Sequence, residues 1–278
     1  MKCAWKELLN ILPPWMRLPV DKIGRESCQE VRLRLGVPPE LVLQRKVVWL
    51  DKPVTRDDLN HCINSASRYS PWNSTTSGQG YLTAPGGHRI GICGDGVVKN
   101  GNLTGFREIR SLCIRVARDF PGIAGELSAK TQSLVIIGAP GWGKTTLLRD
   151  LIRGLSNLDQ HVGVVDERGE LFPTLPAFSP GKCTDVLCGC PKREGIEVLL
   201  RTMGPDWIAV DEITAAEDCD ALLKAGYCGV RLAATAHAGS VEDFQKRPVY
   251  RPLIESGLFH HVMVLRQDKS WTLERMGK

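Results

Sequence analysis

The stretch Ser133–Arg149 reads Ser-Leu-Val-Ile-Ile-Gly-Ala-Pro-Gly-Trp-Gly-Lys-Thr-Thr-Leu-Leu-Arg, and the rest of the chain is organised around it. A short apolar run, Leu134 to Ile137, enters a glycine-rich turn, and a helix-forming segment follows Thr145. The spacing G-x-x-x-x-G-K-[ST] between a strand and a helix is typical of a loop that binds nucleotide phosphates. The stretch therefore predicts a strand, a P-loop and a helix in that order.

The residue types explain why this spacing suits phosphate. Glycines at three positions of the loop let the backbone approach phosphates without a Cβ clash, and its N–H groups then face anionic oxygens. Lys144 reaches the β- and γ-phosphates, and the Thr145 hydroxyl is a ligand for Mg²⁺. We expect ATP and Mg²⁺ to be held by Gly138, Ala139, Pro140, Gly141, Trp142, Gly143, Lys144, Thr145 and Thr146.

Composition places the chain among ordinary globular proteins. It has 278 residues, of which 42% are hydrophobic and 24% charged, enough for two domains. The excess of 36 basic over 31 acidic side chains is too small to argue for a nucleic-acid partner. No apolar run approaches the length of a bilayer span, and the N-terminal segment is too interrupted for a signal peptide. We expect a cytoplasmic protein that only partners would hold at a membrane.

Ten cysteines in a cytoplasmic chain are expected to be free thiols. They cluster only at Cys183, Cys188 and Cys190, where no fourth ligand with C-x-x-C spacing follows. We therefore expect buried or incidental thiols there and no metal site.

The pattern of elements predicts two domains and a linker. Residues 1–120 read as a small α+β domain, with a helix over 5–12 that Pro13-Pro14 ends and a half-exposed strand over 31–35. Residues 121–133 are rich in glycine and polar residues and are expected to be the linker. From 134 to 278 strands alternate with helices, which predicts a mainly parallel sheet. Residues 69–80 and 173–191 are expected to be loops.

Three strands of this second domain end in polar side chains. Asp166-Glu167, Asp211-Glu212 and His237 each follow a strand, and ligands bind outside the carboxyl ends of parallel strands. Asp211 is expected to hold Mg²⁺ together with Thr145, and Glu212 to orient or deprotonate the attacking water. His237 is placed to sense the γ-phosphate, and an acid of the 166–170 segment, Asp166 or Glu167, to polarise water as well.

Other classes of nucleotide protein fit less well. Asp166 and Gly169 have the D-x-x-G spacing of a GTPase switch, but no N-K-x-D guanine-reading motif occurs in the chain. A nucleic-acid protein of RecA type would need a concentrated basic path with stacking aromatic residues, and the basic residues here are dispersed. The L-S-G-G-Q signature of transporter ATPases is missing as well.

Taken in order, these motifs resemble the secretion ATPases, the RecA-like motors of type IV pili and of type II and type IV secretion. The P-loop, the acidic box at 165–170, the Walker B strand ending at Asp211-Glu212 and the histidine box at 235–238 match that family. Further segments resemble the stage III sporulation AA family of endospore-forming bacteria: residues 30–34, 86–91, 114–117, 189–192 and 246–248. The resemblance implies a RecA-like P-loop ATPase domain behind a smaller α+β domain.

The resemblance also implies partners and further site residues. It implies a ring-forming homo-oligomer, a hexamer, on the mother-cell side of the channel between mother cell and forespore. Its partners would be the integral membrane proteins of that channel, with no nucleic acid. Arg89 and Arg115 match segments that donate arginines to phosphate, a role that suits the guanidinium. Thr214-Ala215-Ala216 departs from the family, because a glycine and a basic residue are expected there.

Two functions follow from these expectations. The first is a motor that hydrolyses ATP to power or assemble the channel. The second is a scaffold that binds nucleotide to assemble the channel base and hydrolyses little, which the departure after Walker B leaves open.

Overall fold

The computed structural model describes residues 1–44, 46–67, 80–125, 127, 132–173 and 178–276. They form two compact units, Met1–Asp119 and Phe120–Lys278. We propose that these units are separate domains joined by the predicted linker at 121–133, part of which lies outside the described residues. The predicted loop at 69–80 also lies almost wholly outside them.

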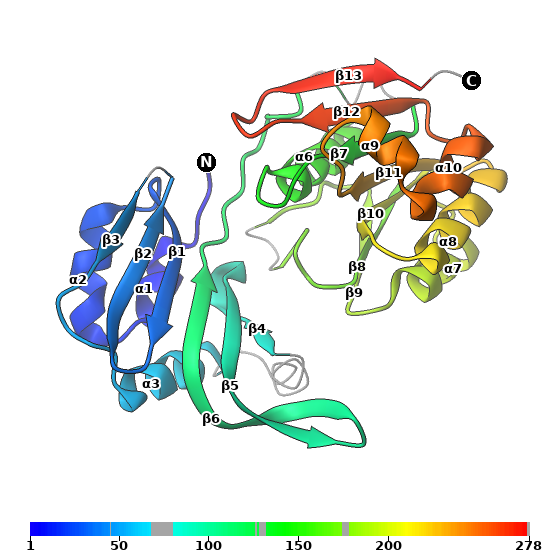
Figure 1. Ribbon diagram of the computed structural model, residues 1–278. Coiled ribbons are helices and arrows are strands. Elements are labelled where there is room, and N and C mark those ends of the chain that lie inside the picture. Colours follow the sequence, from blue (N-terminus) through cyan, green and yellow to red (C-terminus); the bar gives the residue numbers. More distant parts are fainter. Residues whose placement is uncertain (45, 68–79, 126, 128–131, 174–177, 277–278) are drawn as a thin grey trace. The chain divides into compact units, whose positions relative to one another are not determined.

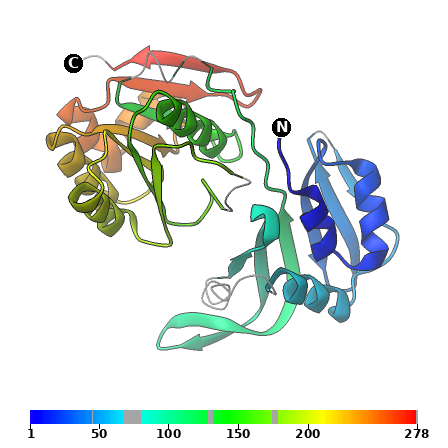
Figure 2. The ribbon, with the colours of Figure 1, turned by 180° about the vertical axis from the view of Figure 1, so that it is seen from behind.

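The first unit is an antiparallel sheet of six strands in the order β3-β2-β1-β6-β5-β4. Its strands are β1 (Cys28–Arg34), β2 (Val37–Leu43), β3 (Val47–Trp49), β4 (Tyr81–Thr83), β5 (Arg89–Lys99) and β6 (Asn102–Arg115). Its helices are α1 (Trp5–Ile11), α2 (Pro14–Ile23), α3 (Arg56–Ser67) and the 3-10 turn η1 (Pro85–Gly87). In both ribbon views α1 and α2 lie on one face of this sheet (Figures 1 and 2).

The strand predicted from the alternation at 31–35 is confirmed by β1. Val31 and Leu33 are fully buried against the helices, whereas Arg32 and Arg34 lie on the other face. The helix expected over 5–12 and ended by Pro13-Pro14 is confirmed by α1, which ends at Ile11. The helix that follows it was not predicted. A second helix begins at Pro14 itself, because proline is well suited to the first helical position, where its missing N–H has no partner to lose.

The second unit is a sheet of seven strands in the order β13-β12-β7-β11-β10-β8-β9. The six strands from β12 to β9 are parallel, and only β13 pairs antiparallel at one edge. The strands are β7 (Leu134–Ile137), β8 (Val162–Asp166), β9 (Thr184–Cys188), β10 (Trp207–Ile213), β11 (Arg231–Ala236), β12 (His261–Leu265) and β13 (Trp271–Arg275). The expected mainly parallel α/β sheet is therefore confirmed.

Helices cover both faces of this sheet. They are α6 (Lys144–Asn157), α7 (Lys192–Thr202), α8 (Ala216–Tyr227), α9 (Val241–Lys246), the turn η2 (Pro248–Tyr250) and α10 (Arg251–Ser256). Helices α7 to α10 share one apolar core with alternate residues of the strands, and α6 packs on the opposite face, as the view from behind shows (Figure 2). The central strands are buried on both sides, which explains their continuous apolar runs.

Two expectations about the second unit have different outcomes. The helix start at Ser240 is confirmed, because the Ser240 side chain accepts a hydrogen bond from the Asp243 N–H. The loop expected at 173–191 is wrong over part of its length, because it contains the edge strand β9. This strand contains only partly buried and exposed residues and pairs on one side only, so its signal in the sequence is weak.

None of the helices in the described part of the chain is long and apolar enough to cross a bilayer.

Candidate functional site

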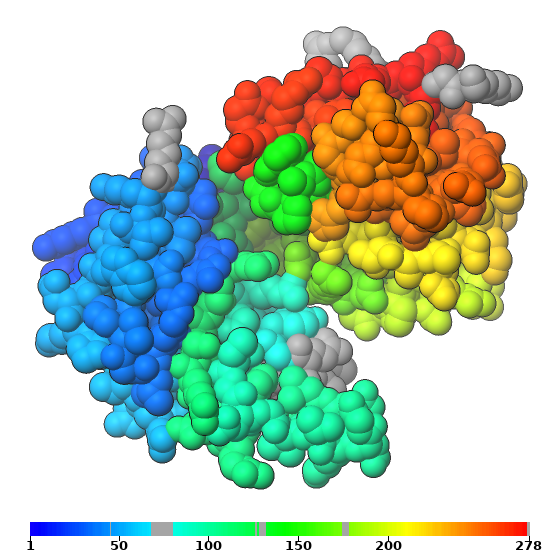
Figure 3. All heavy atoms as spheres, in the orientation of Figure 1, coloured from blue at the N-terminus to red at the C-terminus, as the bar shows by residue number. Residues whose placement is uncertain are grey.

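The P-loop lies between β7 and α6, and its backbone requires glycine at several positions. A Cβ on Gly138 would lie 2.9 Å from the backbone oxygen of Leu265, at the end of the neighbouring strand β12. Gly141 and Gly143 have φ values of 76° and 104°, in the left-handed region that favours glycine. The C-terminal hairpin thus packs directly against this loop, and in the space-filling view it (red) lies beside the green atoms around the start of α6 (Figure 3).

Lys144 begins α6 and is buried against the loop. Its ammonium group donates hydrogen bonds to the carbonyl oxygens of Gly138 and Ala139, at 2.8 and 3.1 Å. The Nδ1 atom of His237 lies 3.1 Å from the same nitrogen. Burial lowers the pKa of Lys144, and the charges of Asp211 and Glu212 oppose that shift in part. All three N–H groups of the ammonium therefore have acceptors within the site.

Asp211 is held by two threonine hydroxyls. Thr145 donates to Oδ2 at 2.7 Å, and Thr235 donates to Oδ1 at 2.5 Å. Burial raises the pKa of this carboxyl, against the lowering effect of the two hydrogen bonds. A hydroxyl at the start of α6 and a carboxylate near the carboxyl end of β10 are oxygen ligands of the kind that Mg²⁺ prefers. Thr145 and Asp211 thus offer oxygen atoms that fit a Mg²⁺ ion, and their binding of Mg²⁺ stays a prediction.

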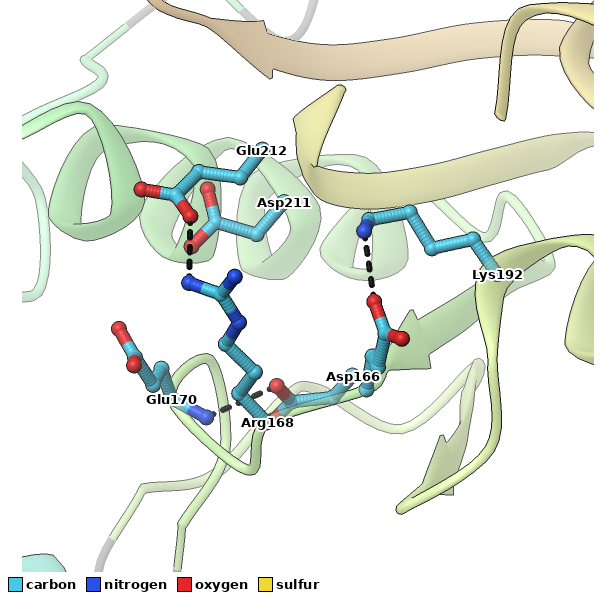
Figure 4. Close-up of a pocket in the computed structure, with 7 residues that line it drawn as sticks. Asp166, Arg168, Glu170, Lys192, Asp211 and Glu212 are labelled. Carbon is cyan, nitrogen blue, oxygen red and sulfur yellow. Dashed lines mark hydrogen bonds and ion pairs between the residues drawn. The ribbon is translucent and has the colours of Figure 1, made fainter. Parts of the chain in front are cut away.

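Glu212 follows in a bulge of β10. The register of β10 with β11 shifts by one residue between Val210 and Ile213, and Glu212 has a φ of 54°. Its N–H donates to the hydroxyl of Thr235 at 2.8 Å, which holds this strained backbone in place. In a regular strand, neighbouring side chains point to opposite faces, but here Asp211 and Glu212 extend in the same direction (Figure 4).

Both oxygens of the Glu212 carboxylate have partners. Oε1 lies 2.8 Å from His237 Nε2, and Oε2 accepts a hydrogen bond from Arg168 at 2.7 Å. Because Lys144 can only donate to Nδ1 of His237, the ring is assigned as the neutral form with its proton on Nε2. Burial would raise the pKa of Glu212, but the hydrogen bond from His237 and the nearby cations outweigh it and lower this pKa.

Asp166 is occupied by the backbone that follows it. Its two oxygens accept hydrogen bonds from the N–H groups of Glu170, Leu171 and Phe172, at 2.8 to 3.0 Å. Burial raises the pKa of this carboxyl, and those hydrogen bonds act in the opposite direction. The side chain therefore closes and fixes the loop after β8.

Glu167 forms an ion pair with the first residue of α7. Its Oε2 lies 2.7 Å from the ammonium of Lys192, which is only 5% exposed. The same ammonium lies 3.6 Å from Asp218, whose carboxylate accepts the backbone N–H groups of Thr214 and Ala215 ahead of α8. Lys192 thus links the acidic box to the segment that follows the Walker B strand.

These side chains line one small pocket. It is formed by Asp166, Glu167, Arg168, Glu170, Lys192, Asp211 and Glu212, and Figure 4 shows its ion pairs. Beside this pocket, hydrogen bonds bring Lys144, Thr145 and His237 together with Asp211 and Glu212 at the carboxyl ends of the strands, as expected. The structure also gives Asp166 and Glu167 partners of their own.

Arg89 and Arg115 belong to the first unit. They are directly paired in the register of β5 and β6. The guanidinium of Arg89 lies over the ring of Tyr81, 4.1 Å from its centroid, and Arg115 lies 3.7 Å from Glu30. Their expected contact with phosphate stays a prediction.

Cys183, Cys188 and Cys190 lie around the edge strand β9 with free thiols. Burial raises the pKa of the Cys188 thiol to about 11 and also raises the pKa of the Cys190 thiol, so neither forms a thiolate readily. Among the described residues no group of three or more metal-ligating side chains was found.

Sequence reasoning missed three residues of the site, Arg168, Lys192 and Thr235. Arg168 and Lys192 follow no spacing rule, because their partners lie 44 and 25 residues away in the chain. A signal for Thr235 was available, since it stands two residues before His237 in the strand after Walker B.

The fold is that of the RecA-like secretion ATPases. The structure of the Legionella pneumophila ATPase DotB matches with a TM-score of 0.60 and 18% identity, over 95% of this chain and 80% of that one. The pilus retraction motor PilT with bound ADP matches with a TM-score of 0.61 and 14% identity, over 94% and 82%. At such identities the likeness concerns the fold.

The chain belongs to the family "Sporulation stage III, protein AA", whose model matches residues 5–273. It is 37% identical over 280 residues to the stage III sporulation protein AA of Bacillus subtilis strain 168, covering 95% of this chain and 91% of that protein.

Proposed function

We propose that the second unit hydrolyses ATP and that this activity powers or assembles the channel between mother cell and forespore. The observation that carries the proposal is the meeting of Thr145, Asp211 and Glu212 beside Lys144 at one edge of the sheet. The relatives support it by what their names state: one is a sporulation protein, and two neighbours in fold are an ATPase and a pilus motor.

In this mechanism each side chain has one task. Lys144 neutralises the β- and γ-phosphates, and the backbone N–H groups of residues 138–145 bind their oxygens. Mg²⁺, held by Thr145 and through Asp211, would supply positive charge at the phosphate oxygens. Glu212 orients the attacking water and accepts its proton.

His237 would report the loss of phosphate. It touches both Lys144 and Glu212, so a change at either side chain moves its hydrogen bonds. Asp166 holds the loop that borders the pocket, and Glu167 fixes it to Lys192. We propose these as positioning tasks, which leaves Glu212 as the carboxylate that acts on water.

The partners follow from the same proposal. The chain would act as a ring-forming homo-oligomer, a hexamer, with Arg89 and Arg115 donating to phosphate. It would lie on the cytoplasmic face of the mother-cell membrane, held by the integral membrane proteins of the channel and without nucleic acid. A ring that shares arginines between subunits would make hydrolysis depend on assembly.

A scaffold that binds ATP but hydrolyses little is the second candidate. It is favoured by Thr214-Ala215-Ala216, where no basic side chain follows the Walker B strand. The two candidates differ in their response to Glu212→Gln, which keeps the size of the side chain and removes its ability to accept a proton. Under the motor proposal this variant binds ATP but neither hydrolyses it nor supports sporulation, whereas a scaffold would still support sporulation.

A further inference from the structure

Four side chains of the site form a continuous chain of contacts. Lys144 donates to His237 Nδ1 at 3.1 Å, His237 Nε2 meets Glu212 Oε1 at 2.8 Å, and Arg168 donates to Glu212 Oε2 at 2.7 Å. The mechanism proposed above needs Lys144 on phosphate and Glu212 on water. This chain of contacts must therefore open before the reaction takes place.

Arg168 is the last residue in this chain of contacts, and it follows β8, whereas Glu212 belongs to β10. It lies in the turn after β8, where the Gly169 N–H bonds back to the Asp166 carbonyl oxygen at 3.2 Å. The Asp166 carboxylate fixes the next residues through three backbone hydrogen bonds, so the turn presents Arg168 to Glu212 in a defined place. Its side chain is half exposed and Glu212 is 30% exposed.

We propose that Arg168 is a positioning residue that holds Glu212 in the closed arrangement and so restrains hydrolysis. In this proposal Arg168 of the acidic box acts on Glu212, while Asp166 and Glu167 of the same box hold the loop after β8. This inference rests on the proposed function, because it concerns the rate of the reaction assigned to Glu212.

The effect of such a contact on kinetics has a definite sign. The ratio kcat/KM compares the transition state with the free protein and free substrate. A contact that exists in the free protein and is broken in the transition state lowers this ratio, and its removal raises the ratio. Exposed ion pairs of this kind change an equilibrium by up to about fivefold. Arg168→Ala should therefore raise kcat/KM for ATP about two- to fivefold.

The opposite role gives the opposite sign. An arginine beside the phosphates could instead stabilise charge in the transition state, and its removal would then lower kcat/KM. A merely structural pair would leave kcat/KM unchanged. Either of these results in a well-folded variant overturns the proposal.

The experiment compares ATP hydrolysis by the purified full chain and its variants. Arg168→Lys keeps a cation that can still reach one oxygen of Glu212, so it should retain most of the restraint. Arg247→Ala is the matched control, since Arg247 pairs with Asp243 at a similar exposure, 45% and 39%, away from the pocket. This control should keep the wild-type kcat/KM.

The double variant tests whether the effect passes through Glu212. Arg168→Ala combined with Glu212→Gln should be as inactive as Glu212→Gln alone, because the restrained carboxylate is then missing. Hydrolysis that returns in the double variant would place the action of Arg168 elsewhere and overturn the proposal.

A second measurement does not depend on turnover. The side-chain N–H signal of Arg168 in NMR, assigned by its loss in Arg168→Ala, should shift in Glu212→Gln. An unchanged signal would show that the pair does not form. If the wild-type protein binds ATP and hydrolyses none, the proposed function fails. If it hydrolyses ATP and Arg168→Ala brings no increase, only this inference fails.

Discussion

Replacing Thr235 with valine tests how the Walker B carboxylates are held. Thr235 is fully buried, and its hydroxyl accepts the Glu212 N–H and donates to Asp211. Valine has nearly the same shape but can make neither hydrogen bond. The variant should therefore remove one of the two hydroxyl partners of the Asp211 carboxylate and leave a strained backbone N–H without an acceptor, at the bulge that carries Asp211 and Glu212.

The size of the effect follows from these two bonds. A hydrogen bond to a charged group contributes about 1.5–3 kcal/mol, and a buried N–H left without an acceptor costs about 1–3 kcal/mol. The two losses share one site and are not fully additive, so we expect Thr235→Val to lower the free energy of unfolding by about 3 kcal/mol.

Thr235→Ser is the matched control, because it keeps the hydroxyl and removes one methyl group. Loss of a buried methyl should cost about 1 kcal/mol. Both variants are compared by urea unfolding of the full chain, followed by tryptophan fluorescence. If Thr235→Val is no less stable than Thr235→Ser, the hydroxyl does not hold the bulge and the reasoning about Glu212 is refuted.

Two further predictions concern other buried polar groups. Burial lowers the pKa of His88 below its usual 6.5, and its Nδ1 accepts a hydrogen bond from the Ala117 N–H at 3.1 Å. Because the unfolded chain takes up this proton more readily than the folded protein, the stability that His88 contributes is complete above about pH 6.5 and falls as the pH drops below that value. The urea concentration at the unfolding midpoint should decrease when the pH is lowered from 7.5 to 5.5, and it should decrease less in His88→Asn. An equal decrease in the wild type and in His88→Asn would contradict this prediction. Lys192→Met leaves Glu167 and Asp218 without their cation and should lower the free energy of unfolding, measured in urea, by about 2 kcal/mol. This loss is smaller than for a fully buried ion pair because Glu167 is partly exposed. Lys192→Arg keeps the positive charge and should lower the free energy of unfolding clearly less.

Much of the second unit could be predicted from the sequence because its signals are local. The P-loop spacing, the buried run before it and the helix after it lie within 17 consecutive residues, from Ser133 to Arg149. The rule that parallel strands carry ligands at their carboxyl ends was enough to bring Asp211, Glu212 and His237 to one edge.

Other features of the structure could not be predicted from the sequence. They depend on contacts between residues far apart in the chain, or on where a residue lies within a helix or turn. Pro14 ends one helix and begins the next, and residue type alone does not distinguish these uses. Whether an acid such as Asp166 faces water or its own loop depends on the turn that follows. Arg168 meets Glu212 only because the turn after β8 and the bulge in β10 face each other.

The expected loop at 173–191 shows a third limit. Its 19 residues were an unusually long connection for a compact domain, which could have suggested a hidden element. The edge strand β9 lacks the continuous apolar run of the central strands, since only one side of it pairs. Its pattern is therefore too weak to separate from a loop.

The most direct test of the account is ATP hydrolysis by the purified wild-type chain and by Lys144→Ala, measured across protein concentration with particle size determined in parallel. The account predicts a turnover per chain that rises as the protein assembles and that vanishes in Lys144→Ala. Turnover that persists in Lys144→Ala, or wild-type protein that binds ATP and assembles without hydrolysing it, would contradict the proposed motor.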